Sequence, residues 1–318
     1  MHSTVDSGIS VVVPVYRGVK SLEALAGRLE AVFAGLRIPH ELLFVDDCSP
    51  DGSWKLIEEL MATRPWIRGF RLMRNFGQHN ALLAGIRQAR YDRIVTMDDD
   101  LQHPPESIPA LLAKLDEGFD VAYGTPERET HGLMRNFCSV ATKAILRHVL
   151  GVVVAREVSS FRAFKTNLRE AFSDYGSPTV FLDVLLTWAT TSFGTVPVPH
   201  CDRAEGESGY TLTKLLLHAT NMVTSFSTVP LRFASLVGIL TIVFGIVLLA
   251  VVLLMWMLGG IPVRGFTFLA SMIVVFSGAQ LLSLGILGEY LARMYLRSMG
   301  RPPYVIAKYP VAAPSRDA

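Results

Sequence analysis

Hydrophobic and polar positions in the amino-terminal part of the chain follow two alternating patterns. Short, β-favouring apolar runs are separated by segments whose apolar residues recur at helical spacing. The predicted strands are "ISVVVPVY", "HELLFVDD", "GFRLMR", "RIVTMD" and "DVAYG". The predicted helices are "SLEALAGRLEAVFAGL", capped by Ser21, a segment at about 53–63, "HNALLAGIRQA", and one whose first turn holds Pro104 and Pro105. Strands that alternate with helices predict a mostly parallel, doubly wound α/β sheet, which binds ligands at the carboxyl ends of its strands.

Two long apolar runs set the carboxyl-terminal part apart. Neither the run from Ala234 to Leu258 nor the run from Phe266 to Gly288 contains a charged residue. Each is longer than the roughly 20 residues that an α-helix needs to cross a bilayer. Only "GGIPVRG" separates them, so they predict a tight hairpin of two transmembrane helices (about 234–258 and 266–288). The alternative is a buried hairpin of core helices.

The basic residues around these runs predict their orientation. Arg232 precedes the first run, and Arg293, Arg297, Arg301 and Lys308 follow the second, whereas the connecting loop carries one arginine. The positive-inside rule therefore puts both outer ends of the hairpin in the cytosol. The polar start "MHSTVDSG" is not a signal peptide and favours the same side. We expect a multi-pass membrane protein with both termini in the cytosol.

A helical pattern of leucines lies just before the first apolar run. The segment "YTLTKLLLHATNMVTSF" places its apolar residues at helical spacing. This pattern is typical of an amphipathic helix that lies at a membrane surface. An ordinary surface helix of the globular part would show the same pattern.

Composition and charge exclude few functions. The 318 residues suffice for one large domain or two moderate ones, and the net charge of +2 gives no reason to expect a nucleic-acid partner. Cys48, Cys138 and Cys201 lie far apart, match no zinc spacing and fit a reducing compartment without disulfides. The chain has neither the glycine fingerprint of a dinucleotide site nor a phosphate-binding Gly-Lys-Ser/Thr loop.

Carboxylates gather where two predicted strands end, in "FVDDCSPDGS" and "TMDDDLQ". In an extended chain alternate side chains share a face, so Asp98, Asp100 and Gln102 could converge on one ion. On this geometry Asp99 points away and is a bystander. Hard oxygen ligands suit Mg²⁺ or Mn²⁺, which then holds substrate phosphates. A solvated acidic loop is the alternative.

Several longer segments are more specific: "VDDCSPDGS", "RNFGQHNALLAGI", "MDDDLQHPPESIP", "FRAF", "EGESGYT", "PLRFASLVG" and "GAQLLSLGILGEYLARMY". On these segments the chain resembles the polyprenyl-phosphate glycosyltransferases of the GT-A fold (glycosyltransferase family 2). This family includes dolichol-phosphate mannose synthase and the bacterial undecaprenyl-phosphate transferases of glucose and of formamidoarabinose. The likeness runs from "VVVPVY" to "GRPPYV", and "GQH" and "GEY" look most like the bacterial enzymes that use UDP-sugars.

The resemblance implies the reaction and the partners. A sugar would pass with inversion from a nucleotide-sugar, most consistently a UDP-sugar, to polyprenyl (undecaprenyl) phosphate, for modification of a cell-envelope glycan. The partners would be these two substrates and the lipid bilayer of a bacterial inner membrane, and small-residue spacing in the hairpin permits a homo-oligomer. The parts would be a cytosolic GT-A domain at 1–207, an interfacial region at 208–232, two transmembrane helices within 233–290 and a cytosolic tail at 291–318.

The resemblance also implies a set of site residues. The divalent ion on the donor diphosphate, Mg²⁺ or Mn²⁺, would bind Asp98, Asp100 and Gln102. The nucleotide pocket would consist of Pro14, Val15, Tyr16, Asp47 and Asp98. The acceptor phosphate would meet Arg128, Arg135, Ser139 and Arg203. The residues with catalytic roles would be Asp98, Asp100, Arg128 and Glu157.

Three motifs depart from the family pattern. The usual Pro-Val-Tyr-Asn-Glu is "PVYRG", so Arg17 and Gly18 stand in the last two places and a carboxylate near the donor is missing. The usual Ser-Lys ends in Gly209, and Lys214 is a candidate substitute. Glu157 stands upstream of "FRAF", where the family usually has Asp. Because of these departures, the sequence does not identify the sugar that is transferred.

Two other functions stay open at this point. A processive polysaccharide synthase shares the GT-A domain, but its Gln-x-x-Arg-Trp motif is missing from this chain. A catalytically silent membrane scaffold or flippase partner could keep the fold without activity.

Overall fold

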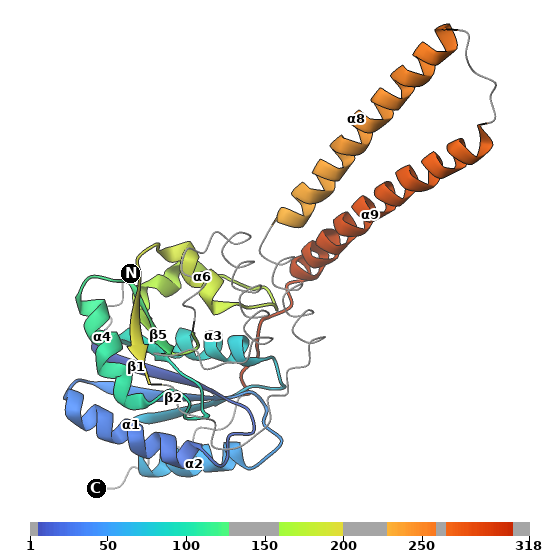
Figure 1. Ribbon diagram of the computed structural model, residues 1–318. Coiled ribbons are helices and arrows are strands. Elements are labelled where there is room, and N and C mark those ends of the chain that lie inside the picture. Colours follow the sequence, from blue (N-terminus) through green and yellow to red (C-terminus); the bar gives the residue numbers. More distant parts are fainter. Residues whose placement is uncertain (1–5, 127–158, 200–227, 259–264, 308–318) are drawn as a thin grey trace. The chain divides into compact units, whose positions relative to one another are not determined.

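The computed structural model describes residues 6–126, 159–199, 228–258 and 265–307 (Figure 1). They belong to two compact units. The globular unit holds the described residues up to 199 and residues 300–307, and the hairpin unit holds the described residues between 228 and 299.

A seven-stranded sheet forms the centre of the globular unit. Its strands are β1 (Asp6–Val15), β2 (His40–Asp46), β3 (Ile67–Arg71), β4 (Tyr91–Thr96), β5 (Val121–Pro126), β6 (Arg162–Lys165) and β7 (Phe193–Val198), in the order β3-β2-β1-β4-β6-β5-β7. The strands β1 to β4 run parallel to one another, and β7 is parallel to β5. Short β6 runs antiparallel to both β4 and β5. The predicted α/β sheet is therefore confirmed, with a reversed strand that the apolar pattern did not predict.

The helices alternate with the strands as the sequence predicts. They are α1 (Leu22–Leu36), α2 (Ser53–Thr63), α3 (Gln78–Gln88), α4 (Ile108–Asp116) and α6 (Leu182–Ala189), with 3₁₀ turns η1 (Pro105–Ser107) and η2 (Thr166–Phe172). The predicted cap of α1 is wrong in one respect. Ser21 precedes the helix, but its hydroxyl donates to the carbonyl of Gly18 (3.0 Å) and caps no helical N–H.

Both faces of the central strands are buried, as helices on both sides of a parallel sheet require. In β1, Val11 and Val13 belong to the cluster with the apolar stripe of α1, and all are fully buried. On the other face α3 lies close to the sheet because it carries Gly85. A Cβ there would lie 2.4 Å from Val12 Cγ1 and 3.0 Å from Val45 Cγ2. Gly85 thus sets the distance between α3 and the ends of the strands.

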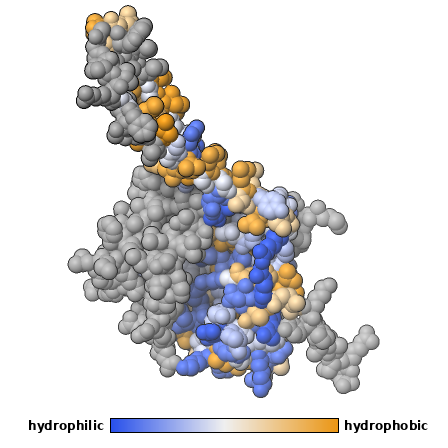
Figure 2. Space-filling view, turned by 90° about the vertical axis from the view of Figure 1, so that its right-hand side faces the viewer, coloured by the Kyte–Doolittle hydropathy of each residue, from blue (hydrophilic) through white to orange (hydrophobic). Residues whose placement is uncertain are grey.

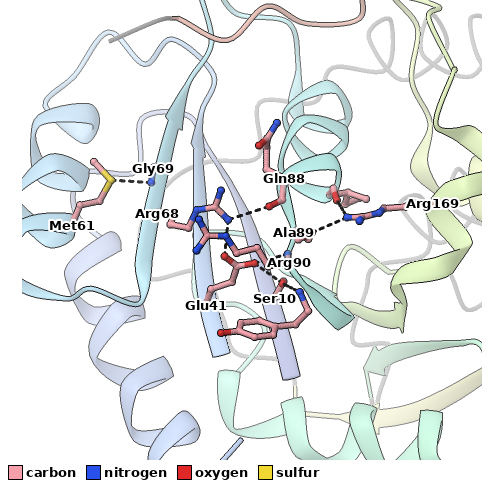
Figure 3. Close-up of polar contacts among 11 residues, drawn as sticks. Ser10, Glu41, Met61, Arg68, Gly69, Gln88, Ala89, Arg90 and Arg169 are labelled. Atoms are coloured by element: carbon pink, nitrogen blue, oxygen red, sulfur yellow. Dashed lines mark hydrogen bonds and ion pairs between the residues drawn. The ribbon is translucent and has the colours of Figure 1, made fainter. Parts of the chain in front are cut away.

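A buried carboxylate joins three strands at the amino end of the sheet (Figure 3). Glu41 is 4% exposed and accepts hydrogen bonds from the Ser10 hydroxyl (2.7 Å) and the Arg90 backbone N–H (2.8 Å). The Arg68 guanidinium donates to its other oxygen (2.7 Å) and to the Gln88 carbonyl (3.1 Å). The charge is therefore paired and fully hydrogen-bonded, which its burial requires.

A C-terminal strap (residues 300–307) completes the globular unit. Gly300 has φ 64°, the left-handed conformation that commonly ends a helix. The strap then pairs antiparallel beyond β3. Met73 N–H donates to Val305 O (2.9 Å), and Ala307 N–H donates to Arg71 O (2.8 Å). The Arg87 guanidinium lies over the Tyr304 ring, 5.7 Å from its centroid. The strap therefore fixes the segment that leads from β3 toward α3.

The hairpin unit consists of two long apolar helices, α8 (Val229–Met257) and α9 (Phe266–Ser298). Both are longer than the predicted apolar runs, because residues that favour helix flank those runs. The stretches long and apolar enough to cross a membrane are Val229–Leu248 and Val275–Ser298. Consecutive residues such as Ile242, Val243 and Phe244 are each more than half exposed. Figure 2 shows hydrophobic side chains gathered on the described part of this unit.

We predict that Glu41→Ala destabilises the protein strongly. The change leaves the partly buried Arg68 guanidinium without its carboxylate and removes the acceptor of two further donors. The expected loss is about 3 kcal/mol of unfolding free energy. Thermal unfolding of the purified full-length protein measures it. Glu59→Ala is the control, because Glu59 is exposed and lies 3.9 Å from the exposed Lys55. Equal melting temperatures for the two variants would refute the structural role of Glu41.

The strap predicts a local change in hydrogen exchange. A deletion of residues 301–318 removes the acceptor of the Met73 N–H, whereas a deletion of residues 308–318 keeps it. Peptides that cover residues 71–77 should exchange faster in the longer deletion alone, because an amide without its partner is exposed to solvent. The peptide around Leu42, whose N–H donates to Trp66 O, serves as internal reference. The same exchange in both deletions would show that the strap does not hold this segment.

Candidate functional site

A pocket of about 270 Å³ opens at the carboxyl ends of β1, β2 and β4. This is the edge at which the doubly wound sheet is predicted to bind ligands. The pocket is lined by Pro14, Val15, Tyr16, Asp47, Asn75, Gly77, Gln78, Asp98, Asp99 and Asp100. The structure thus brings together the five residues predicted to bind the nucleotide and both predicted metal-binding aspartates.

Asp98 is held by two side chains from different elements. Gln78, the first residue of α3, donates from Nε2 to Oδ1 (2.6 Å), and the Ser160 hydroxyl donates to Oδ2 (2.7 Å). Ser160 also accepts a hydrogen bond at its carbonyl from the Thr96 hydroxyl (3.0 Å). The segment before β6 is therefore tied to the end of β4, and the orientation of the Asp98 carboxylate is fixed on both sides.

A buried cation lies behind this carboxylate. Arg162 of β6 is 1% exposed and forms an ion pair with Asp183, which also accepts a hydrogen bond from the Tyr123 hydroxyl (3.0 Å). Burial alone lowers the pKa of the Arg162 guanidinium, but the charges of the Asp183 and Asp98 carboxylates raise it above its ordinary value. Arg162 therefore stays charged and offsets part of the negative charge of the pocket.

The prediction that Asp99 points away from the others is wrong. β4 ends at Thr96, residues 99 and 100 lie in a turn, and Leu101 is left-handed with φ 59°. Alternation of side chains holds only in an extended chain, so Asp98, Asp99 and Asp100 all line the pocket. Gln102 is not among the lining residues, and its backbone N–H donates to Asp100 Oδ1 (3.2 Å). Its role as a metal ligand stays a prediction.

Asp47 organises the loop that precedes α3. Its two oxygens accept hydrogen bonds from the backbone N–H groups of Phe76 (2.7 Å) and Gly77 (2.8 Å). Burial raises the pKa of Asp47, and these two hydrogen bonds oppose the shift. Gly77 has φ 97°, which a glycine adopts without strain. The loop thus starts α3 beside the pocket, where the positive end of the helix dipole favours an anion.

The end of β1 supplies an aromatic wall. Tyr16 lines the pocket and is 46% exposed, and the Arg17 guanidinium lies over its ring, 5.5 Å from the centroid. A partly exposed ring next to a charged pocket suits a flat, polar ligand such as a nucleobase.

The donor set fits a divalent ion that a ligand shares. Asp98 and Asp100 offer carboxylate oxygens, which Mg²⁺ and Mn²⁺ prefer. Among the described residues no group of three or more His, Cys, Asp or Glu side chains is placed to hold a metal alone. Mg²⁺ commonly takes one or two protein carboxylates and completes its shell with substrate phosphates and water.

Other predicted residues lie outside the described part of the chain: Arg128, Arg135, Ser139, Glu157 and Arg203. Sequence reasoning in turn assigned no role to Asn75, Gly77, Gln78 and Ser160. Gln78 stands in the quoted segment "RNFGQHNALLAGI", which was the available signal. Ser160 directly precedes "FRAF", and only the fold shows that it meets Asp98.

Comparisons with known proteins agree on one family. The sequence profile of "Glycosyl transferase family 2" matches residues 10–173. An undecaprenyl-phosphate 4-deoxy-4-formamido-L-arabinose transferase from Shewanella sediminis is 33% identical over 98% of this chain and 95% of its own length. The protein of the same name from Klebsiella pneumoniae is 33% identical over 94% of this chain and 93% of its own length.

Among solved structures the fold is similar to that of glucosyl-3-phosphoglycerate synthase from Mycobacterium tuberculosis. The TM-score is 0.52 at 18% identity, over 69% of this chain and 78% of that chain. That crystal structure contains Mn²⁺, UDP and glucosyl-3-phosphoglycerate. At this identity the likeness concerns the fold.

The contacts of Asp98 predict how metal binding depends on Ser160. In Ser160→Ala one carboxylate oxygen of Asp98 loses its fixed donor. The affinity for Mn²⁺ should fall about tenfold or more, as for other losses of a group that orients a metal ligand. Titration of the full-length protein with Mn²⁺, followed by electron paramagnetic resonance, measures this affinity. Ser159→Ala is the control, since Ser159 accepts a hydrogen bond from Phe161 N–H and does not contact Asp98. If both variants bind Mn²⁺ alike, Ser160 does not orient the ligand.

Proposed function

The chain belongs to glycosyl transferase family 2, and on that basis we propose that it transfers a sugar from a UDP-sugar to undecaprenyl phosphate. The observation that carries the proposal is a single pocket in which an aromatic end of β1 meets the carboxylates at the end of β4. A nucleoside and a metal-bound diphosphate need these two surfaces side by side. The relatives that match over nearly their whole length are named undecaprenyl-phosphate transferases, and these names support a lipid phosphate as acceptor.

The donor side uses residues of the described pocket. Tyr16, with Pro14, Val15 and Asp47, would contact the nucleoside. Asp98 and Asp100 would hold Mg²⁺ or Mn²⁺, which when bound neutralises charge on the diphosphate leaving group. Gln78 and Ser160 orient Asp98 for this role. The start of α3 adds the positive end of a helix dipole to the same site.

The acceptor side needs little proton transfer. The second pKa of a phosphate monoester is about 6, so the lipid phosphate is already an oxyanion at neutral pH. Its oxygen would attack the anomeric carbon while the bond from that carbon to the UDP oxygen breaks, with inversion and without a covalent enzyme intermediate. Arg128, Arg135 and Arg203, with Ser139, would hold the phosphate in line, because guanidinium groups bind phosphate bidentately. Glu157 would then have no essential role as a base.

The hairpin unit would anchor this site at a bilayer. Its helices expose many large apolar side chains, an arrangement that is stable only in an apolar surrounding. The C-terminal strap belongs to the same unit as β1 to β7, so the chain must return to the side from which it left. Each of the two helices would therefore cross the bilayer once. We place the globular unit on the cytosolic face of a bacterial inner membrane.

The relatives' names make UDP-4-deoxy-4-formamido-L-arabinose the first donor to test. The same names do not favour a processive polysaccharide synthase or a silent scaffold, the two alternatives from the sequence.

The test is a transfer assay with the full-length protein. A panel of labelled UDP- and GDP-sugars is mixed with undecaprenyl phosphate and Mn²⁺, and label in the organic phase is counted. We expect transfer from at least one UDP-sugar, none with a chelator, and a loss of about a hundredfold or more in Asp100→Asn. Asp116→Asn is the control, because Asp116 is an exposed partner of Arg93. No transfer from any donor in a broad panel would contradict the proposal.

A further inference from the structure

We propose that the buried Arg162 is a positioning residue, which acts through Asp98 and makes the pocket favour a metal–diphosphate complex over the metal ion alone. Its positive charge would weaken the binding of a bare divalent cation and strengthen the binding of the same cation together with a nucleoside diphosphate. This inference rests on the proposed function, since that complex is the donor side of the reaction.

The pairing of β6 with β4 holds Arg162 behind Asp98. Arg162 is the register partner of Thr96, which stands two residues before Asp98. Two residues before Arg162, the Ser160 hydroxyl donates to Asp98 Oδ2 (2.7 Å), and the Ser160 carbonyl accepts from the Thr96 hydroxyl (3.0 Å). Arg162 itself is not among the residues that line the pocket. A ligand would therefore meet its charge through the Asp98 carboxylate and not by direct contact.

The surroundings of Arg162 keep its charge effective. The side chain is 1% exposed and forms an ion pair with Asp183 of α6, and its guanidinium lies over the Tyr123 ring, 5.8 Å from the centroid. Burial and the charge of Asp183 raise the pKa of the Tyr123 hydroxyl well above its ordinary value, so this group stays neutral and donates to Asp183 (3.0 Å). In such a medium of low dielectric constant a charge acts more strongly than in water.

Stability alone does not explain a cation in this place. A buried ion pair contributes little net stability, because both ions lose their hydration. Within the described part of the chain, Nε of Arg162 is buried without a hydrogen-bond partner. The carboxylate of Glu41, by contrast, is engaged by protein donors at both oxygens. The other carboxylate whose charge acts on Arg162 is that of Asp98, so the cation has an effect on the pocket.

The sign of the charge decides which ligand gains from it. Aspartates line the pocket and attract any cation, and they repel a diphosphate. Arg162 opposes both effects. A bare divalent ion is repelled by the guanidinium, whereas a nucleoside diphosphate with one divalent ion carries a net negative charge and is attracted by it. Loss of the charge should therefore move the two affinities in opposite directions.

The experiment measures two affinities for the full-length wild type and for Arg162→Gln. Glutamine removes the positive charge and keeps an amide that can donate to Asp183. Electron paramagnetic resonance follows the titration with bare Mn²⁺, and calorimetry follows the titration with UDP at saturating Mn²⁺. In Arg162→Gln we expect bare Mn²⁺ to bind about fivefold or more tightly, and UDP about fivefold or more weakly, than in the wild type, because a unit charge near the ligands is lost.

Arg93→Gln is the matched control. Arg93 lies in the first half of β4, and its partner Asp116 (3.3 Å) is largely exposed. The same exchange there should leave both affinities at their wild-type values.

A second pair of variants covers a failure of Arg162→Gln to fold. Asp183→Asn and the double variant Arg162→Gln/Asp183→Asn also differ by the one charge at position 162, and neither carries a buried carboxylate at position 183. The double variant should bind bare Mn²⁺ more tightly, and UDP with Mn²⁺ more weakly, than Asp183→Asn.

Opposite shifts support the inference, because a purely structural loss lowers both affinities together. A joint decrease overturns it, as do two unchanged affinities. If the wild type does not bind UDP with Mn²⁺, the proposed function fails, which is a separate outcome. The titration with bare Mn²⁺ then decides on Arg162 alone: tighter binding without the charge supports its action on the pocket, and equal or weaker binding refutes it.

Discussion

Negative charge concentrated at the carboxyl edge of the sheet is the constraint on which the globular unit depends. One small pocket is lined by four aspartates: Asp47, Asp98, Asp99 and Asp100. Like charges gathered in so small a volume repel one another. The fold supplies fixed donors from several elements: backbone amides of the loop before α3, the first side chain of α3, and the hydroxyl before β6. The reversed strand β6 also brings the buried Arg162 behind Asp98.

The two ends of the sheet handle buried charge in different ways. At the amino end Glu41 has every oxygen engaged by protein donors and contributes to stability alone. At the carboxyl end fixed donors hold Asp47 and Asp98 at an open pocket, and the proposed metal-bound donor would complete the balance of charge. Carboxylates thus stabilise the amino end of the sheet and line the pocket at its carboxyl end.

The sequence predicts correctly the helices and strands that depend on local hydrophobic pattern. The bounds predicted for α2 agree with the structure, and the strands β1 to β5 lie where apolar runs predict them. The sequence did not predict the side-chain orientations and contacts that tertiary geometry determines. The turn at residues 99 and 100, followed by left-handed Leu101, breaks the alternation that was assumed from Asp98 to Gln102. Asp98 accepts a hydrogen bond from Ser160, which lies 62 positions away in the sequence. The Asp99 carboxylate lies beside Gly18, 81 positions away. No local periodicity in the sequence encodes these contacts.

The C-terminal strap has a consequence for biosynthesis. The ribosome makes the strap after both apolar helices, so the globular unit stays incomplete until the hairpin has been synthesised. If the hairpin crosses a bilayer as proposed, a chain in which one helix fails to insert would leave the strap on the far side. Arg71 and Met73 would then lose their backbone partners, and an unpaired strand edge invites aggregation or proteolysis. On the proposed placement, closure of the strap would link completion of the globular unit to correct membrane insertion.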